Sequence, residues 1–343
     1  DTEEAMSAPE RIYEVTKYIL DHFDQKTYRY QNRSYFTHGV ITNVEEVASA
    51  RHNDAKEQKD NRKINGFNSI FAVASIPMAM RYYTEFKRQL AERNQKLSVA
   101  TIFSFSANED DPEDALPDEG FETDKLDKTS RDFLDAAIAD YNNTFNVNYD
   151  TSADKFQNYY KDISLRVKNR EIDLLIVVNM FLTGFDATTL NTLWVDKNLR
   201  QHGLLQAFSR TNRILNSVKT FGNIICFRNL QQATDEAIAL FGNKEAGGIV
   251  LLKTYDEYYN GYEEDGKHKP GYAELIGLIR STYPVGQAII SDKAQKEFIR
   301  LFGAILRLKN ILTAFDDFAG NEILSERDFQ DYQSIYIDLY QEH

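Results

Sequence analysis

Apolar runs alternate with amphipathic stretches along the first two-thirds of the chain. Mostly apolar runs are typical of buried strands, and the chain has such runs at 70–74, 99–103, 172–178, 193–195 and 221–227. Apolar residues at helical spacing occupy much of the sequence between these runs, at 77–92, 130–142, 152–169 and 200–212. The pattern therefore predicts strands that alternate with helices.

Alternating strands and helices predict an α/β fold, with a parallel, doubly wound sheet and helices on both of its faces. Ligands of such sheets bind beyond the carboxyl ends of the strands. Residues 179–186, Asn-Met-Phe-Leu-Thr-Gly-Phe-Asp, directly follow the strand predicted at 172–178. We therefore expect this segment to lie at the ligand-binding edge of the sheet.

The pattern differs on either side of this region. Residues 9–25 are predicted to form an amphipathic helix, whereas 44–63 are polar and charged, which is typical of either a solvated helix or an insertion. Toward the end of the chain the pattern becomes helical, at 272–280, 292–315 and 327–341. We expect an α/β domain at 1–243, in which 1–65 form a leading helix and a polar insertion, followed by a mostly α-helical domain at 244–343.

The composition is that of an ordinary globular protein, with 343 residues and a net charge of −13. The charge is uneven, because 109–127 are rich in Asp and Glu while 197–219 contain basic residues and no acidic one. Phosphate binding depends on the local patch, so the total charge does not exclude a nucleic-acid partner. The single cysteine, Cys226, and the lack of an apolar run of about 20 residues predict a cytoplasmic protein without disulfides or a membrane span.

The acid-free stretch contains a candidate anion site. At ~100° per residue, Gln206, Arg210 and Arg213 fall on one face of the predicted helix, and Leu204 and Phe208 fall on the other. Arginine binds phosphate oxygens bidentately and stays charged at any working pH, so a triphosphate is the expected ligand. The alternative is an exposed helix face that makes surface ion pairs.

Two runs at this spacing and in this order carry a resemblance to a known family. Residues 172–214 resemble motifs V and VI of a superfamily 2 helicase, which lie in its second RecA-like lobe. The sequences Phe181-Leu-Thr-Gly-Phe-Asp-Ala and Gln206-Ala-Phe-Ser-Arg-Thr-Asn-Arg-Ile are most similar to those of the motor (R) subunit of type I restriction–modification enzymes. The resemblance covers roughly 67–240 and extends more loosely into the helical region, which would match that subunit's helical domain.

The resemblance implies a role for each matching residue. Arg210 and Arg213 match the motif VI arginines, one of which acts as an arginine finger on the γ-phosphate of ATP, and Gln206 would orient the same network. Gly184 and Asp186 match motif V, with Asp186 near the nucleotide ribose or coupling the two sites. The residues implied to contact the DNA backbone are Thr183, Ser75 and Ser104, the two serines on weaker grounds. One departure is Ser209, where many helicases have glycine before the first motif VI arginine.

Motifs that the chain lacks are equally informative. It has no Gly-x-x-x-x-Gly-Lys-Ser/Thr loop and no Asp-Glu-x-His sequence, both of which belong to the first lobe of such motors. The cofactors implied are therefore ATP and Mg²⁺, bound mainly by that missing first lobe, and the chain alone is expected to hydrolyse no ATP. The scattered histidines predict no metal site, and no nuclease pattern is present.

The sequence thus predicts part of an ATP-dependent translocase of double-stranded DNA from a type I restriction endonuclease. The implied partners are double-stranded DNA, the first RecA-like lobe and nuclease domain of the same subunit, and the methyltransferase and specificity subunits, with no membrane. Two alternatives stay open. One is another superfamily 2 DNA translocase, and the other is a degenerate RecA-like lobe that serves as a protein-interaction scaffold.

Overall fold

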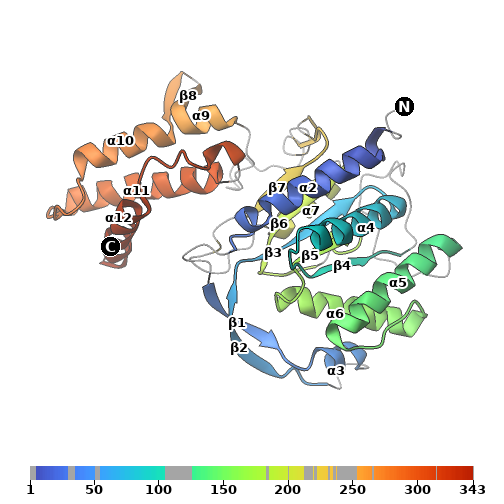
Figure 1. Ribbon diagram of the computed structural model, residues 1–343. Coiled ribbons are helices and arrows are strands. Elements are labelled where there is room, and N and C mark those ends of the chain that lie inside the picture. Colours follow the sequence, from blue (N-terminus) through green and yellow to red (C-terminus); the bar gives the residue numbers. More distant parts are fainter. Residues whose placement is uncertain are drawn as a thin grey trace. The chain divides into compact units, whose positions relative to one another are not determined.

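The computed structural model divides the chain into two compact units, Asp1–Lys244 and Glu245–His343 (Figure 1). The residues that it describes are 5–29, 35–50, 55–104, 126–182, 185–199, 201–211, 219, 222–230, 232–234, 237, 253–264, 266–313 and 315–342.

A five-stranded parallel sheet forms the centre of the first unit, in the order β4-β5-β3-β6-β7. Its strands are β3 (Asn68–Val73), β4 (Val99–Ile102), β5 (Leu174–Val177), β6 (Leu190–Asp196) and β7 (Asn223–Cys226). Every residue of β3, β5 and β6 is buried, as expected for parallel strands covered on both faces. The predicted α/β class and parallel sheet are confirmed.

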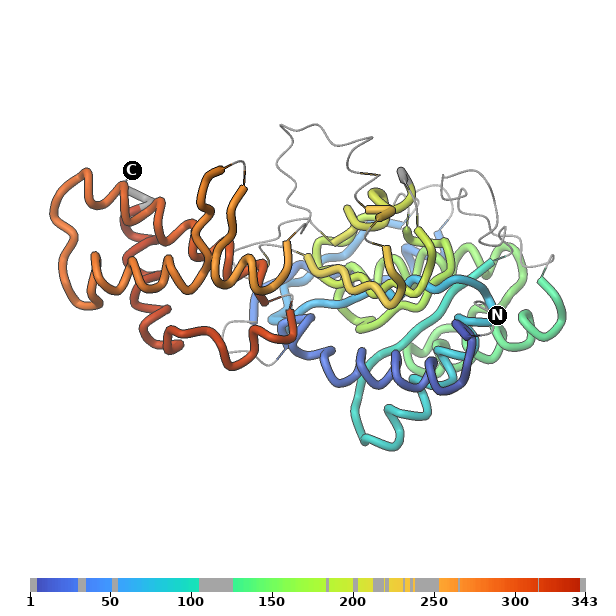
Figure 2. The backbone as a smooth tube through the Cα atoms, turned by 90° about the horizontal axis from the view of Figure 1, so that it is seen from above, coloured from blue at the N-terminus to red at the C-terminus, as the bar shows by residue number. Residues whose placement is uncertain are grey.

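Helices cover both faces of this sheet. Figure 2 shows α2 (Pro9–Lys26) and α4 (Ile76–Glu92) on one side, and α6 (Ala153–Lys168) with α7 (Gln201–Phe208) on the other. Helix α5 (Lys128–Phe145) packs near the edge strand β4. Right-handed crossovers account for the division, because the chain moves one way along the sheet from β3 to β4 and the opposite way from β4 to β7.

An antiparallel ribbon precedes the sheet. Strand β1 (Tyr35–Ile41) pairs with the largely exposed β2 (Lys59–Asn65), and the short helix α3 (Val44–Ser49) lies between them in sequence. The polar stretch 44–63, for which the pattern left a solvated helix or an insertion open, thus holds α3 and most of β2. The ribbon is fastened to the sheet domain by the Asn169 side chain, which pairs with both the N–H and the carbonyl of Ile41 at 2.8 Å.

The second unit has a core of its own, formed by apolar and aromatic side chains that include Tyr272, Phe298, Phe302 and Ile305. Its elements are α9 (Tyr255–Asn260), the hairpin of β8 (Gly261–Glu264) and β9 (Lys267–Pro270), α10 (Tyr272–Thr282), α11 (Asp292–Leu312) and α12 (Glu326–Glu342). The predicted helical region is confirmed. In the described part of the chain, no helix has both the length and the apolarity that crossing a membrane requires.

A buried carboxylate at the end of β6 joins the sheet to the helices on one face. Asp196 is fully buried and accepts hydrogen bonds from Arg11 of α2 at 2.6 and 2.7 Å and from Tyr82 of α4 at 2.5 Å. Arg228, which follows β7, adds a bond at 3.0 Å. Burial opposes ionisation, but these donors outweigh it and hold the pKa of Asp196 below its usual value.

Replacing Asp196 with Asn should lower the free energy of unfolding of the sheet domain by about 3–5 kcal/mol, because Arg11 and Arg228 would keep buried charges without their counter-ion. Urea unfolding followed by fluorescence measures this directly, since Trp194 is the single tryptophan and is buried in β6. The control is Asp21→Asn, which removes two solvent-exposed ion pairs of α2, with Lys17 and Arg93, and should cost less than about 1 kcal/mol. Equal losses in both variants would contradict the account.

The same carboxylate predicts a pH dependence. Because its pKa is depressed in the folded state, Asp196 stabilises the fold above its unfolded value of 3.8, and this contribution is lost as the pH falls through the lower folded value. The stability difference between wild type and Asp196→Asn should therefore be constant from pH 5 to 7 and shrink below about pH 3.8. A difference that grows with acidity would refute the assignment.

Candidate functional site

The segment after β5 crosses the face of the sheet that α6 and α7 cover. Phe181 packs on Tyr160 in the middle of α6, with ring centroids 4.7 Å apart, and Phe185 lies beside Lys168, the last residue of that helix. Further along, the Thr189 hydroxyl donates to the Val167 carbonyl at 3.1 Å. Because α6 runs toward the start of β5, the segment travels from the carboxyl ends of the strands toward their amino ends.

This path corrects one expectation. The segment 179–186 begins at the carboxyl edge, but its last residues do not lie there: Phe185 is near the end of α6, and the exposed Asp186 follows it. The reason is topological, since β6 is parallel to β5 and the chain must return to the opposite edge to begin it. Thr183 and Gly184 lie outside the described residues.

Arg210 joins this segment to the second motif-bearing run. Its Nη1 donates to the Phe185 carbonyl at 2.6 Å, its Nε to the Gln206 carbonyl at 3.0 Å and its Nη2 to the Ser209 hydroxyl at 3.1 Å. The structure therefore brings Gln206, Arg210 and the residue before Asp186 together. Arg213 lies outside the described residues.

The predicted helical face is only partly correct. Helix α7 ends at Phe208, and Ser209–Thr211 form a 3₁₀ turn, so the ~100° spacing does not extend to Arg210. Leu204 is fully buried, as predicted, whereas Phe208 packs against the core while only partly buried. The turn tightens where the Ser209 hydroxyl donates to the Gln206 carbonyl at 2.8 Å, a local bond that competes with the helical pattern.

The acceptors around Arg210 leave its charge uncompensated. They are two carbonyls and a hydroxyl, and within the described part of the chain Arg210 forms no ion pair. Described residues accept from three of its five N–H donors, which leaves one hydrogen on each Nη without an acceptor among them. This arrangement can bind an anion while the rest of the guanidinium stays fixed.

The two candidate serines lie at the carboxyl edge of the sheet. Ser75 follows β3 and caps α4, with its Oγ accepting from the Met78 N–H at 3.4 Å, and the buried Ser104 follows β4. They are therefore separate from Arg210, which contacts the segment after β5 at Phe185, near the end of α6.

Sequence reasoning missed Lys197, which directly follows β6. It is buried, and its Nζ donates to the Asn179 side chain at 2.6 Å and to the Val178 carbonyl at 3.3 Å. The bonds fix the point where the chain leaves β5. The sequence offers one signal for it, a lysine two residues after the apolar run 193–195.

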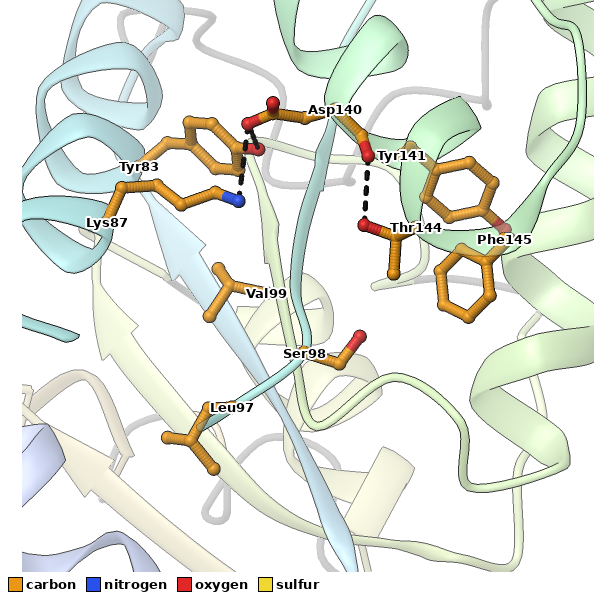
Figure 3. Close-up of a pocket in the computed structure, with 9 residues that line it drawn as sticks. All are labelled: Tyr83, Lys87, Leu97, Ser98, Val99, Asp140, Tyr141, Thr144 and Phe145. Atoms are coloured by element: carbon orange, nitrogen blue, oxygen red, sulfur yellow. Dashed lines mark hydrogen bonds and ion pairs between the residues drawn. The ribbon is translucent and has the colours of Figure 1, made fainter. Parts of the chain in front are cut away.

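A small pocket lies elsewhere, between α4, α5 and the start of β4 (Figure 3). Its volume is about 90 Å³, and the Lys87 ammonium and the Tyr83 hydroxyl each lie 3.2 Å from the Asp140 carboxylate at its rim. Nucleotide-sized ligands need cavities of about 300 Å³ or more, and none of the candidate residues lines this one. Among the described residues, no group of His, Cys, Asp or Glu is placed to hold a metal ion.

Two family models match consecutive parts of this chain. Residues 65–229 match the family model described as type I restriction enzyme subunit R domain 3, and 250–343 match that of the type I restriction and modification enzyme subunit R C terminal. A solved structure, the second domain of the DEAD-box helicase Mss116p bound to an RNA duplex, aligns with 80% of this chain and 86% of its own at 14% identity. The TM-score of this alignment is 0.24.

Curated relatives match over nearly the whole chain. An endonuclease subunit of a type I restriction enzyme from Staphylococcus aureus (strain COL) is 34% identical over 99% of the chain and 32% of its own length. Another from Staphylococcus saprophyticus is 39% identical over 85% of the chain and 30% of its own length. The chain thus spans about a third of the length of these relatives. With two R-subunit domains matched in order, the chain belongs to the R (endonuclease) subunit family of type I restriction enzymes.

Proposed function

We propose that this chain supplies the second RecA-like lobe, at 1–243, and the helical domain, at 244–343, of the ATP-driven motor of a cytoplasmic type I restriction enzyme. In the complete subunit it would complete an ATP site whose other wall is the first lobe. Turnover at that site would drive translocation of double-stranded DNA, and a separate nuclease domain would cleave it. The methyltransferase and specificity subunits would be its partners in the assembled enzyme.

The observation that carries this proposal is the hydrogen bond from Arg210 to the Phe185 carbonyl. It makes one structural unit of the two runs that resemble motifs V and VI, although 25 residues separate the bonded pair in sequence. Asp186, the next residue, would then stand close to the nucleotide, and Gly184 would let the backbone approach it. Gln206 would hold the network through its carbonyl, which Arg210 already contacts.

The geometry suggests a division of labour between the two arginines. Arg210 donates three hydrogen bonds to described residues of its own chain. This suits a positioning residue whose two other N–H groups would bind a phosphate oxygen. Arg213 would then be the arginine finger that stabilises charge on the γ-phosphate in the transition state. Because no metal-binding cluster is found in the described chain, Mg²⁺ would be held by the nucleotide and the first lobe.

DNA would contact the carboxyl edge of the sheet. Ser75, Thr183 and, once its buried hydroxyl becomes exposed, Ser104 would donate hydrogen bonds to phosphate oxygens. Lys197 would fix the start of the segment that carries Thr183. Contacts with the backbone suit a motor, because they carry no sequence information and so allow movement along any DNA.

In the complete subunit, Arg213→Ala should lower DNA-stimulated ATP hydrolysis by about 10³–10⁵-fold, because the transition-state charge loses its partner. Steady-state ATPase and translocation assays measure the effect, and DNA loading in the absence of ATP should not change. The control is Arg88→Ala, which removes an exposed arginine of α4 paired with Glu85 and Glu92. Normal turnover in Arg213→Ala would rule out its assignment as the arginine finger.

The isolated chain should hydrolyse no ATP, with or without DNA, because the loop that cradles the phosphates is not in its sequence. Release of phosphate from ATP by the purified chain, measured with and without double-stranded DNA, tests this. DNA-stimulated turnover would show that the active site is not shared with a first lobe.

A further inference from the structure

We propose that Lys168 is a further binding residue of the nucleotide site and contacts a phosphate oxygen of ATP, an inference that rests on the function proposed above. Lys168 is the exposed last residue of α6, and its Nζ lies 5.6 Å from the centre of the Phe185 ring. The carbonyl of Phe185 accepts from Arg210. Two cations from different elements thus contact one residue, which immediately precedes Asp186.

The backbone that carries Lys168 is held on both sides. Its carbonyl lies 2.8 Å from the His38 Nε2 of the β1–β2 ribbon, and the next residue, Asn169, is paired with Ile41 of the same ribbon. The end of α6 is therefore fixed, while the lysine side chain keeps its own freedom. Binding of an anion there would order only the lysine side chain, which costs less entropy than ordering a mobile loop as well.

The charge of Lys168 is available. In the described portion of the chain Lys168 forms no ion pair, whereas Lys87 and Lys155 each pair with a carboxylate. Like charges near one residue repel one another unless an anion lies between them, and Arg210 also has no carboxylate partner there. A polyphosphate fits this need, because lysine binds phosphate as a point charge and arginine binds it through a planar fork.

The β1–β2 ribbon contacts the end of α6 beside Lys168. Its predicted character as a polar insertion does not explain why His38 and Ile41 contact the end of α6. In our proposal the ribbon positions Lys168 and so belongs to the support of the nucleotide site.

The test uses the complete subunit in the assembled enzyme and compares Lys168→Gln with Lys161→Gln. Lys161 is exposed on the same helix, seven residues earlier, which places it on the same stripe about 10 Å away. Lys168→Gln should raise the KM for ATP at saturating DNA by about tenfold or more, with little change in kcat. Lys161→Gln should stay within about twofold of wild type, and Lys168→Arg should recover most of the affinity.

A second measurement needs no variant. Acylation of lysine amines in the wild-type enzyme, mapped by mass spectrometry with and without a non-hydrolysable ATP analogue, should show protection of Lys168 and none of Lys161. This measurement tests the contact between Lys168 and ATP even if the Lys168→Gln variant fails to fold.

Equal KM values in the two glutamine variants, or equal reactivity of Lys168 with and without the analogue, would overturn the proposal. Weaker DNA binding by Lys168→Gln at an unchanged KM for ATP would also overturn it and assign the lysine to DNA. The two levels of the account remain distinguishable. If Arg213→Ala abolishes turnover while Lys168→Gln behaves like Lys161→Gln, only the role of Lys168 fails. Normal turnover in Arg213→Ala would instead remove this lobe from the ATP site, and with it the proposed function.

Discussion

A single hydrogen bond, from the Arg210 guanidinium to the Phe185 carbonyl, gives the candidate site its geometry. It joins the segment that returns from β5 to β6 with the turn that follows α7. Both lie on the same face of the sheet because the chain advances in one direction from β5 through β6 to β7. A charged donor on a carbonyl makes a strong bond without neutralising the charge, so the arginine is held in place and still attracts anions.

Two consecutive residues at the end of β6 bind neighbouring elements of the sheet domain. Asp196 gathers Arg11 and Tyr82 from the helices of one face, and Lys197 reaches the end of β5 and the first residue of the segment beyond it. Helix α2 is therefore bound to the sheet through the bonds between Arg11 and Asp196, in addition to its apolar packing.

Much of the fold could be predicted from the sequence, because buried parallel strands are apolar along their whole length. The exceptions have identifiable causes. Strand β6 begins at Leu190 rather than 193, since the polar residues Asn191 and Thr192 are buried with their side chains bonded to the Lys26 carbonyl. Strand β2 has no apolar pattern because almost all of it is exposed, and only its pairing with β1 reveals it.

The candidate site was less predictable. Spacing placed Arg210 beside Gln206, and the structure brings the two residues into contact through a 3₁₀ turn and a backbone carbonyl instead of a shared helical face. The contact with Phe185 depends on how the segment crosses α6, which no local pattern encodes. Single lysines such as Lys168 and Lys197 are common on any chain, so only their tertiary neighbours distinguish them.

The most direct test of the central claim is a structure of the complete subunit with Mg²⁺ and a non-hydrolysable ATP analogue. The account predicts that Arg213 lies within hydrogen-bond distance of the γ-phosphate, while Arg210 still donates to the Phe185 carbonyl and directs a remaining N–H toward the triphosphate. Both arginines turned away from the nucleotide, or paired with carboxylates of the first lobe, would contradict it.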